Sequence, residues 1–95
     1  MYARVARWEG VEPERMQEMT EQIKGSDGPP PGVPAKGIML LNDPDSGRNL
    51  TIALFDSEED MRTGDEALSA MDAGGDGTGS RTSVEMYEVA IDRRI

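Results

Sequence analysis

Residues 38–55 read IMLLNDPDSGRNLTIALF, and this stretch decides the fold. Two apolar runs, Ile38–Leu41 and Leu50–Phe55, flank a polar segment that contains proline, glycine and aspartate. Two strands joined by such a short loop of turn-forming residues predict an antiparallel hairpin. Because strand side chains alternate between the two faces of a sheet, both faces of this hairpin carry apolar residues and both need a cover.

A helix and a last strand are expected after the hairpin. Ser57 stands where a helix would begin, and the acidic residues directly after it suit the positive end of a helix dipole. We expect Gly64, in the middle of this helix, to allow a strand to come close. The glycine-rich residues 73–80 predict a flexible loop, and residues 82–91 predict the last strand. The inward stripe of the helix would comprise Met61, Gly64, Leu68 and Met71.

The chain before the hairpin predicts a strand and another helix. Residues 2–8 have the pattern of a strand, and Pro13 suits the first turn of a helix because its missing N–H is not needed there. Gly25 is expected to end the helix with a left-handed cap. Residues 25–37 hold four prolines and four glycines, which predicts an exposed connecting loop within a single domain, 1–95. The inward stripe of this helix would comprise Met16, Met19 and Ile23.

The predicted order is strand, helix, strand, strand, helix, strand. This order is typical of the ferredoxin-like α+β fold, a four-stranded antiparallel sheet with two helices on one face. The helices can cover only one face of the apolar hairpin. We therefore expect a second copy of the chain to cover the other face, which predicts a homodimer.

Charge and composition exclude several classes of function. The net charge of −9 repels phosphate backbones and anionic membranes, so neither nucleic acid nor a membrane surface is an expected partner. The chain has no cysteine and no histidine, which excludes thiolate chemistry, histidine triads and the common zinc, iron and haem ligand sets. We expect no metal and no cofactor. No apolar run has the length of a signal peptide or a membrane span, so a cytoplasmic location is expected.

Three motifs have ordinary structural explanations. Residues 74–78, GGDGT, resemble a glycine-rich nucleotide loop, but they follow a helix and precede a strand, which is the wrong order. Residues 43–47 resemble a calcium loop, but the ligand positions of an EF-hand fall out of register. The acidic residues from Asp56 to Asp60 suit a helix start. The methionines at positions 16, 19, 61 and 71 either fill the core or line a pocket, and both possibilities stay open.

Four aromatic or basic side chains are candidates for a ligand site. Tyr2, Arg4 and Trp8 share one face of the first strand, because side chains alternate. Tyr87 shares a face of the last strand with Glu85, and these two strands are usually neighbours in this topology. We therefore expect Arg4 to contact Glu85 or Tyr87, either as a structural ion pair or as the wall of a ligand cavity.

The chain resembles the dimeric α+β barrel superfamily, especially its antibiotic-biosynthesis-monooxygenase-like branch. The resemblance rests on the opening residues 1–5, MYARV, on the hairpin with the FDSEEDM segment at 55–61, and on the closing residues 83–89, SVEMYEV. It covers nearly the whole chain and implies that two ferredoxin-like sheets pack face to face as a barrel. Characterised relatives include cofactor-independent monooxygenases of phenols and quinols, and haem-degrading enzymes that depend on a histidine ligand. This chain departs from the second group, because it has no histidine.

Two functions remain open at this level. The first is a cofactor-independent, monooxygenase-like homodimer that acts on phenolic or quinol-type compounds, with a site built from Tyr2, Arg4, Trp8 and Tyr87. The second is a non-enzymatic binding, stress or accessory module of the same fold. A cavity above roughly 300 Å³ with converging polar groups would favour the first function. A space filled by Met16, Met61 and Leu68 would favour the second.

Overall fold

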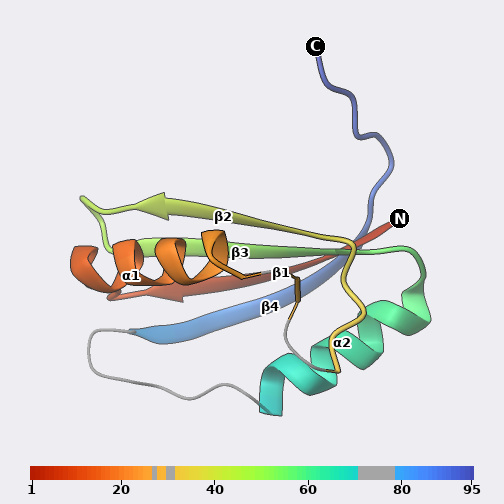
Figure 1. Ribbon diagram of the computed structural model, residues 1–95, viewed down its shortest axis with the longest axis horizontal. Coiled ribbons are helices and arrows are strands. Elements are labelled where there is room, and N and C mark those ends of the chain that lie inside the picture. The colour runs from red at the N-terminus through yellow and green to blue at the C-terminus, as the bar shows by residue number, and fades with distance from the viewer. Residues whose placement is uncertain (27, 30–31, 71–78) are drawn as a thin grey trace.

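The structure is a computed structural model that describes residues 1–26, 28–29, 32–70 and 79–95. The elements follow the predicted order. They are β1 (Tyr2–Glu9), α1 (Pro13–Lys24), β2 (Gly37–Asp43), β3 (Arg48–Phe55), α2 (Glu58–Ala70) and β4 (Ser80–Glu88). The strands form one sheet in the order β2-β3-β1-β4, and each neighbouring pair is antiparallel (Figure 1). This topology confirms the predicted ferredoxin-like α+β fold.

The register of the strands decides which side chains share a face. Ile38 lies opposite Ala53, and Ala53 lies opposite Arg4, so these three residues point to the same side of the sheet. This side carries the helices and is called the helical face. Met39, Ile52 and Val5 form the matching row on the other side, called the open face. Both faces of the hairpin are therefore apolar, as the alternating sequence predicts.

The core lies between the helical face and α2. Phe55 is fully buried, and it packs in one cluster with Val33, Ala53 and Met61. Gly64 faces the Phe55 ring, and a Cβ atom built on this glycine would lie 2.5 Å from Phe55 Cε1. The glycine therefore allows the close approach of strand and helix that the sequence predicts.

The connecting loop differs from the sequence expectation. Residues 25–37 were expected to be an exposed connector, but Val33 is buried in the core cluster. An apolar residue that lies between prolines and glycines gains about 1.5–3 kcal/mol from burial, so the segment folds inward at this point. The loop thus helps to close the space between sheet and helices.

The ends of the helices give one confirmation and one correction. Ser57 Oγ accepts a hydrogen bond of 3.1 Å from the backbone N–H of Asp60, which confirms the predicted cap of α2. Gly25 has φ −84°, so the predicted left-handed cap is wrong. Gly25 has a right-handed conformation instead, and its N–H donates a hydrogen bond of 3.0 Å to the Glu21 carbonyl. Met71 and the 74–78 motif lie outside the described residues.

The last strand covers residues 80–88 and not the predicted 82–91, so it begins inside the predicted loop 73–80, and an extended tail follows it. β4 ends at Glu88, and residues 89–95 leave the sheet (Figure 1). The tail is tied at its start by a hydrogen bond of 2.9 Å from the Val89 N–H to the Met1 carbonyl. Within the part of the chain that the structure describes, no helix is long and apolar enough to span a membrane.

Candidate functional site

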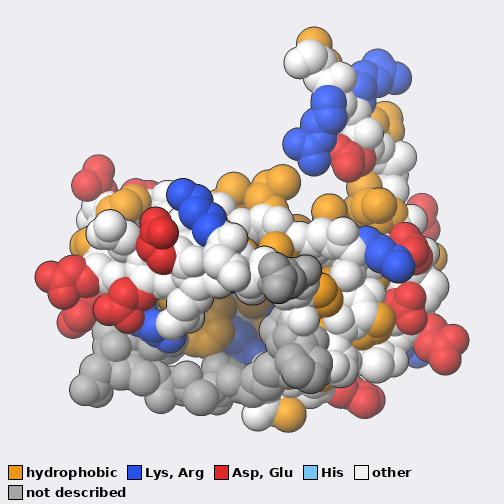
Figure 2. All heavy atoms as spheres, viewed as in Figure 1, with side chains coloured by type: hydrophobic (Ala, Val, Ile, Leu, Met, Phe, Trp, Pro, Cys, Tyr) orange, Lys and Arg blue, Asp and Glu red, His pale blue; other side chains and the backbone are white. Residues whose placement is uncertain are grey.

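A cavity of about 820 Å³ lies on the helical face, between the sheet and α1. Figure 2 shows a hollow in which hydrophobic and basic side chains are visible. The sheet contributes residues from all four strands, and the remaining walls come from both helices and the connecting loop. The lining comprises Arg4, Ala6, Trp8, Arg15, Met19, Gln22, Ile23, Ser26, Gly28, Pro29, Val33, Ala35, Lys36, Gly37, Ile38, Thr51, Ala53, Leu68 and Arg81.

Small side chains in the centre of the sheet explain why this space stays open. Ala6 and Ala53 are almost completely buried and form part of the floor. A larger apolar residue at either position would occupy volume that the cavity now has. Met16 and Met61 are buried as well, but neither lines the cavity. Met16 and Met61 therefore fill core positions, whereas Met19 lines the cavity.

Arg4 is the most unusual side chain of the cavity lining. Only 4% of it is exposed, and its Nε donates a hydrogen bond of 2.8 Å to Oδ1 of Asp65 in α2. Among the described residues, its Nη2 atom is buried and has no hydrogen-bond partner. A buried guanidinium normally satisfies most of its five N–H groups, and an unsatisfied donor costs about 1–3 kcal/mol. The arrangement therefore leaves one unsatisfied donor on a residue of the cavity lining.

The predicted partners of Arg4 are wrong, and the register explains why. Arg4 lies opposite Met86 of β4, whereas Glu85 lies opposite Val5 and Tyr87 lies opposite Ala3. Glu85 and Tyr87 consequently point to the open face, while Arg4 points to the helical face. The true partner, Asp65, is 61 residues away in sequence and was missed. Asp65 follows Gly64 in α2, and it comes within reach of Arg4 only when Gly64 packs this helix closely against the sheet.

The four predicted site residues do not form one group. Arg4 and Trp8 both line the cavity. Tyr2 lies at the other end of β1 from Trp8 and packs against the core cluster around Phe55. Tyr87 lies on the open face. The structure thus brings Arg4 and Trp8 to the same cavity and separates Tyr87 from them.

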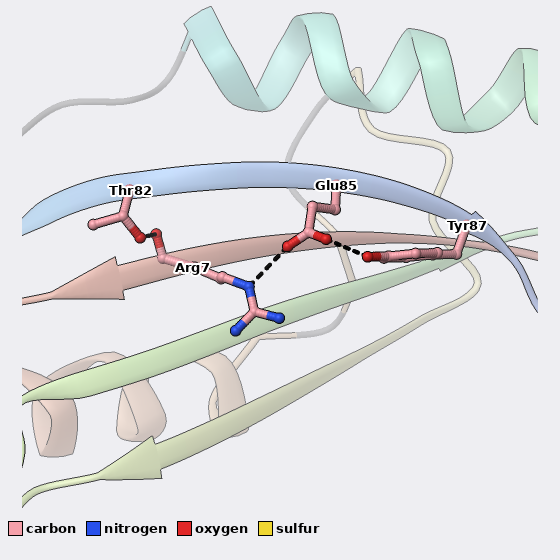
Figure 3. Close-up of polar contacts among 4 residues, drawn as sticks. All are labelled: Arg7, Thr82, Glu85 and Tyr87. Carbon is pink, nitrogen blue, oxygen red and sulfur yellow. Dashed lines mark hydrogen bonds and ion pairs between the residues drawn. The ribbon is translucent and has the colours of Figure 1, made fainter.

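Tyr87 belongs to a second polar group, which sequence reasoning did not find (Figure 3). Arg7 Nε donates to Glu85 Oε1 over 2.8 Å, and the Tyr87 hydroxyl donates to Glu85 Oε2. The bond from Tyr87, together with Arg7, lowers the pKa of the Glu85 carboxyl. The same carboxylate raises the pKa of the Tyr87 hydroxyl. The phenol is therefore held neutral as a donor and is not prepared to act as a base.

The cavity lining does not fit a metal or a metalloporphyrin. Among the described residues, no three side chains of the metal-binding types are grouped closely enough to hold an ion. The described lining offers no imidazole, thiolate or phenolate, and Met19 is its one sulfur ligand. We therefore derive no step of chemistry through a haem or a metal ion.

Comparison with solved structures identifies the fold. An arginine-to-serine mutant of MhuD, with two manganese protoporphyrin IX bound per active site, matches with a TM-score of 0.67 and 17% identity, covering 99% of both chains. A putative antibiotic biosynthesis monooxygenase from Chloroflexus aurantiacus J-10-fl matches with a TM-score of 0.59 and 10% identity, covering 99% of this chain and 97% of the other. No protein-family model and no curated protein matches the chain. The chain thus shares the ferredoxin-like fold of these two structures, and the predicted resemblance is confirmed at the level of the fold.

Proposed function

We propose that this protein binds a small aromatic compound of the phenol or quinol type in the cavity on the helical face. The observation that carries the proposal is a cavity of about 820 Å³ that contains both Trp8 and the buried guanidinium of Arg4. This volume is well above the roughly 300 Å³ of the smallest common ligand sites. An apolar floor with a few polar groups is typical of such sites, since the floor supplies burial and the polar groups fix orientation.

The reaction that this arrangement supports is oxidation of the bound ring by molecular oxygen. Trp8 would offer a face or an edge to the ring, and Arg4 would stabilise the phenolate or enolate form in which the ring is electron-rich. In such a monooxygenation the substrate itself supplies the electrons. One oxygen atom enters the product as a carbonyl, and the other leaves as water.

A second function, a binding or accessory module without catalysis, is favoured by one specific observation. No aspartate, glutamate or histidine is among the described residues of the lining. A phenol bound there would find no carboxylate or imidazole to take its proton. A ligand that already arrives as an anion would not need one.

Trp8 provides the test, because it is the only tryptophan in the chain and lines the cavity. We expect 1-naphthol and naphthohydroquinone to quench its fluorescence with saturation, and an oxygen electrode to report oxygen consumption if the protein is a monooxygenase. Ala6→Leu should weaken binding at least tenfold by filling the floor, whereas Ala70→Leu, at an exposed helix position outside the lining, should not. Binding that Ala6→Leu leaves unchanged would place the ligand elsewhere. Saturable binding without oxygen uptake would favour the accessory module.

We also propose that the open face is the interface of a homodimer. Met39 is 39% exposed and Leu41 is 44% exposed on this face, next to the partly buried Val5, Leu50 and Ile52. An apolar sheet surface of this kind normally has a cover. The polar group of Arg7, Glu85 and Tyr87 on the same face is already paired internally, so it tolerates burial better than separate charges would.

The oligomeric state tests this part of the proposal. We expect a dimer at micromolar concentration in light scattering, with an interface above roughly 2,000 Å² in total. Leu41→Asp should raise the dissociation constant of the dimer at least about 100-fold. The substitution is present in both protomers, so a twofold dimer loses the apolar contacts twice and buries two carboxylates. Gln17→Asp adds the same charge on exposed α1 and is the control. A wild-type monomer, or a Leu41→Asp dimer of unchanged stability, would disprove the interface.

A further inference from the structure

The charges that line the cavity are opposite in sign to the charge of the chain. The chain carries 19 acidic and 10 basic residues. Nevertheless, each charged side chain among the described lining residues is basic: Arg4, Arg15, Lys36 and Arg81. A cavity lined by one sign of charge concentrates a ligand of the other sign, and its low-dielectric walls strengthen the field.

Among the described residues, the carboxylates that pair with Arg4, Arg15 and Lys36 stand outside the lining. Asp65 binds Arg4, Glu18 lies 3.2 Å from Arg15, and the closest Lys36–Asp56 approach is 3.7 Å. Asp65, Glu18 and Asp56 are not lining residues. These three carboxylates reduce the positive potential, but they do so from outside the lining, so Arg4, Arg15 and Lys36 are the members of these pairs that line the cavity.

Arg4 provides an independent observation that points to an acceptor. Its side chain is 96% buried, and the single bond to Asp65 uses only Nε. Nη2 has no partner among the described residues. An oxyanion is the acceptor that a guanidinium binds most strongly, because its oxygens match the planar fork of N–H groups.

We infer that the ligand of this cavity is an aromatic carboxylate, of the hydroxyaryl carboxylate class, whose anionic group is recognised by Arg4. The apolar floor of Ala6, Ala53 and Trp8 would bury the ring, while Arg4 and Lys36 would face its carboxylate. Inorganic phosphate has no apolar surface to bury, so its binding would gain only the electrostatic attraction to the basic side chains. This inference rests on the proposed function in one respect, namely that the cavity is a binding site.

The test compares two probes that differ by one carboxylate. Binding of 1-naphthol and of 1-hydroxy-2-naphthoate is measured by Trp8 fluorescence at low ionic strength, with inorganic phosphate as a competitor. We expect the carboxylate to bind at least tenfold more tightly than the naphthol, and millimolar phosphate not to displace it. Equal affinities would overturn the inference but leave the proposed function standing. Absence of quenching by both probes would instead reject the proposed function. Displacement by millimolar phosphate would show a general anion site and overturn the aromatic class.

Variants identify the residue that recognises the anion. Arg4→Met should reduce the preference for the carboxylate at least tenfold, because the affinity for 1-hydroxy-2-naphthoate should fall much more than the affinity for naphthol. Lys36→Gln, at an exposed position where folding is not at risk, should reduce the preference about two- to threefold. Arg48→Gln removes the same charge from an exposed residue outside the lining and should leave the preference unchanged. A preference that survives in both Arg4→Met and Lys36→Gln, or that falls equally in Arg48→Gln, would overturn the assignment.

Discussion

The pair between Arg4 and Asp65 predicts an asymmetry between its two halves. Asp65→Asn keeps an oxygen that accepts the hydrogen bond from Nε, so it removes only the negative charge. The guanidinium, 4% exposed, then remains in the protein without a counter-charge. Arg4→Met removes the buried charge and the unsatisfied Nη2 together. It leaves a carboxylate that is 28% exposed and can be hydrated.

The expected magnitudes follow from these exposures. Breaking a fully buried pair by removing one partner costs about 3–5 kcal/mol, and the partial exposure of Asp65 reduces this to about 2 kcal/mol for Asp65→Asn. Arg4→Met should change the free energy of unfolding by less than about 1 kcal/mol, since a well-packed apolar side chain replaces a buried charge. A domain of this length has roughly 5–14 kcal/mol in total, so both variants should fold.

Urea denaturation measures the asymmetry. With a slope of about 2 kcal/mol per molar urea, Asp65→Asn should lower the midpoint by roughly 1 M and Arg4→Met by less than about 0.5 M. The double variant should be close to Arg4→Met, because the aspartate matters only while the arginine is present. All variants must be compared at one protein concentration, since a dimer gains stability with concentration. An Asp65→Asn midpoint within 0.3 M of the wild type, or a larger loss in Arg4→Met, would refute the assigned pairing.

Three further predictions address the core and the open face. Gly64→Ala should lower the free energy of unfolding by about 1–2 kcal/mol despite the better helix propensity of alanine, because the new methyl would lie 2.5 Å from Phe55 Cε1. Adding Phe55→Leu to this variant should recover part of the lost stability. A Gly64→Ala variant that is more stable than the wild type would contradict the contact. Val33→Ala should cost about 1.5 kcal/mol in thermal or urea unfolding, whereas an exposed loop residue would cost almost nothing. Glu85→Gln should lower the pKa of Tyr87 towards its ordinary value in an ultraviolet absorbance titration, because the hydrogen bond to Glu85 is the largest cause of the raised pKa. The stability from this bond is complete below the ordinary phenol pKa and is lost as pH rises through the raised one. An unchanged titration would reject the coupling.

Part of the candidate site could be predicted from local pattern. The alternation of β1 put Arg4 and Trp8 on one face, and this depends only on strand geometry. The cap at Ser57 and the close approach at Gly64 could likewise be anticipated, because the cap involves neighbours within a few residues and the close approach involves one helix face. Tyr87 was misplaced relative to Arg4, since alternation defines faces within a strand but not the register between strands.

The sequence by itself determined the elements, their order and the two apolar faces of the hairpin, because periodicity and turn chemistry act over short distances. Only the tertiary structure decided that Arg4, Arg15 and Lys36 line one cavity while Asp65, Glu18 and Asp56, which pair with them, stand outside the lining. It also decided that Arg4 pairs with Asp65 and that Val33 enters the core. Those contacts join residues far apart in the chain. They depend on the registers of the strands and the packing of α2, which side-chain alternation does not contain.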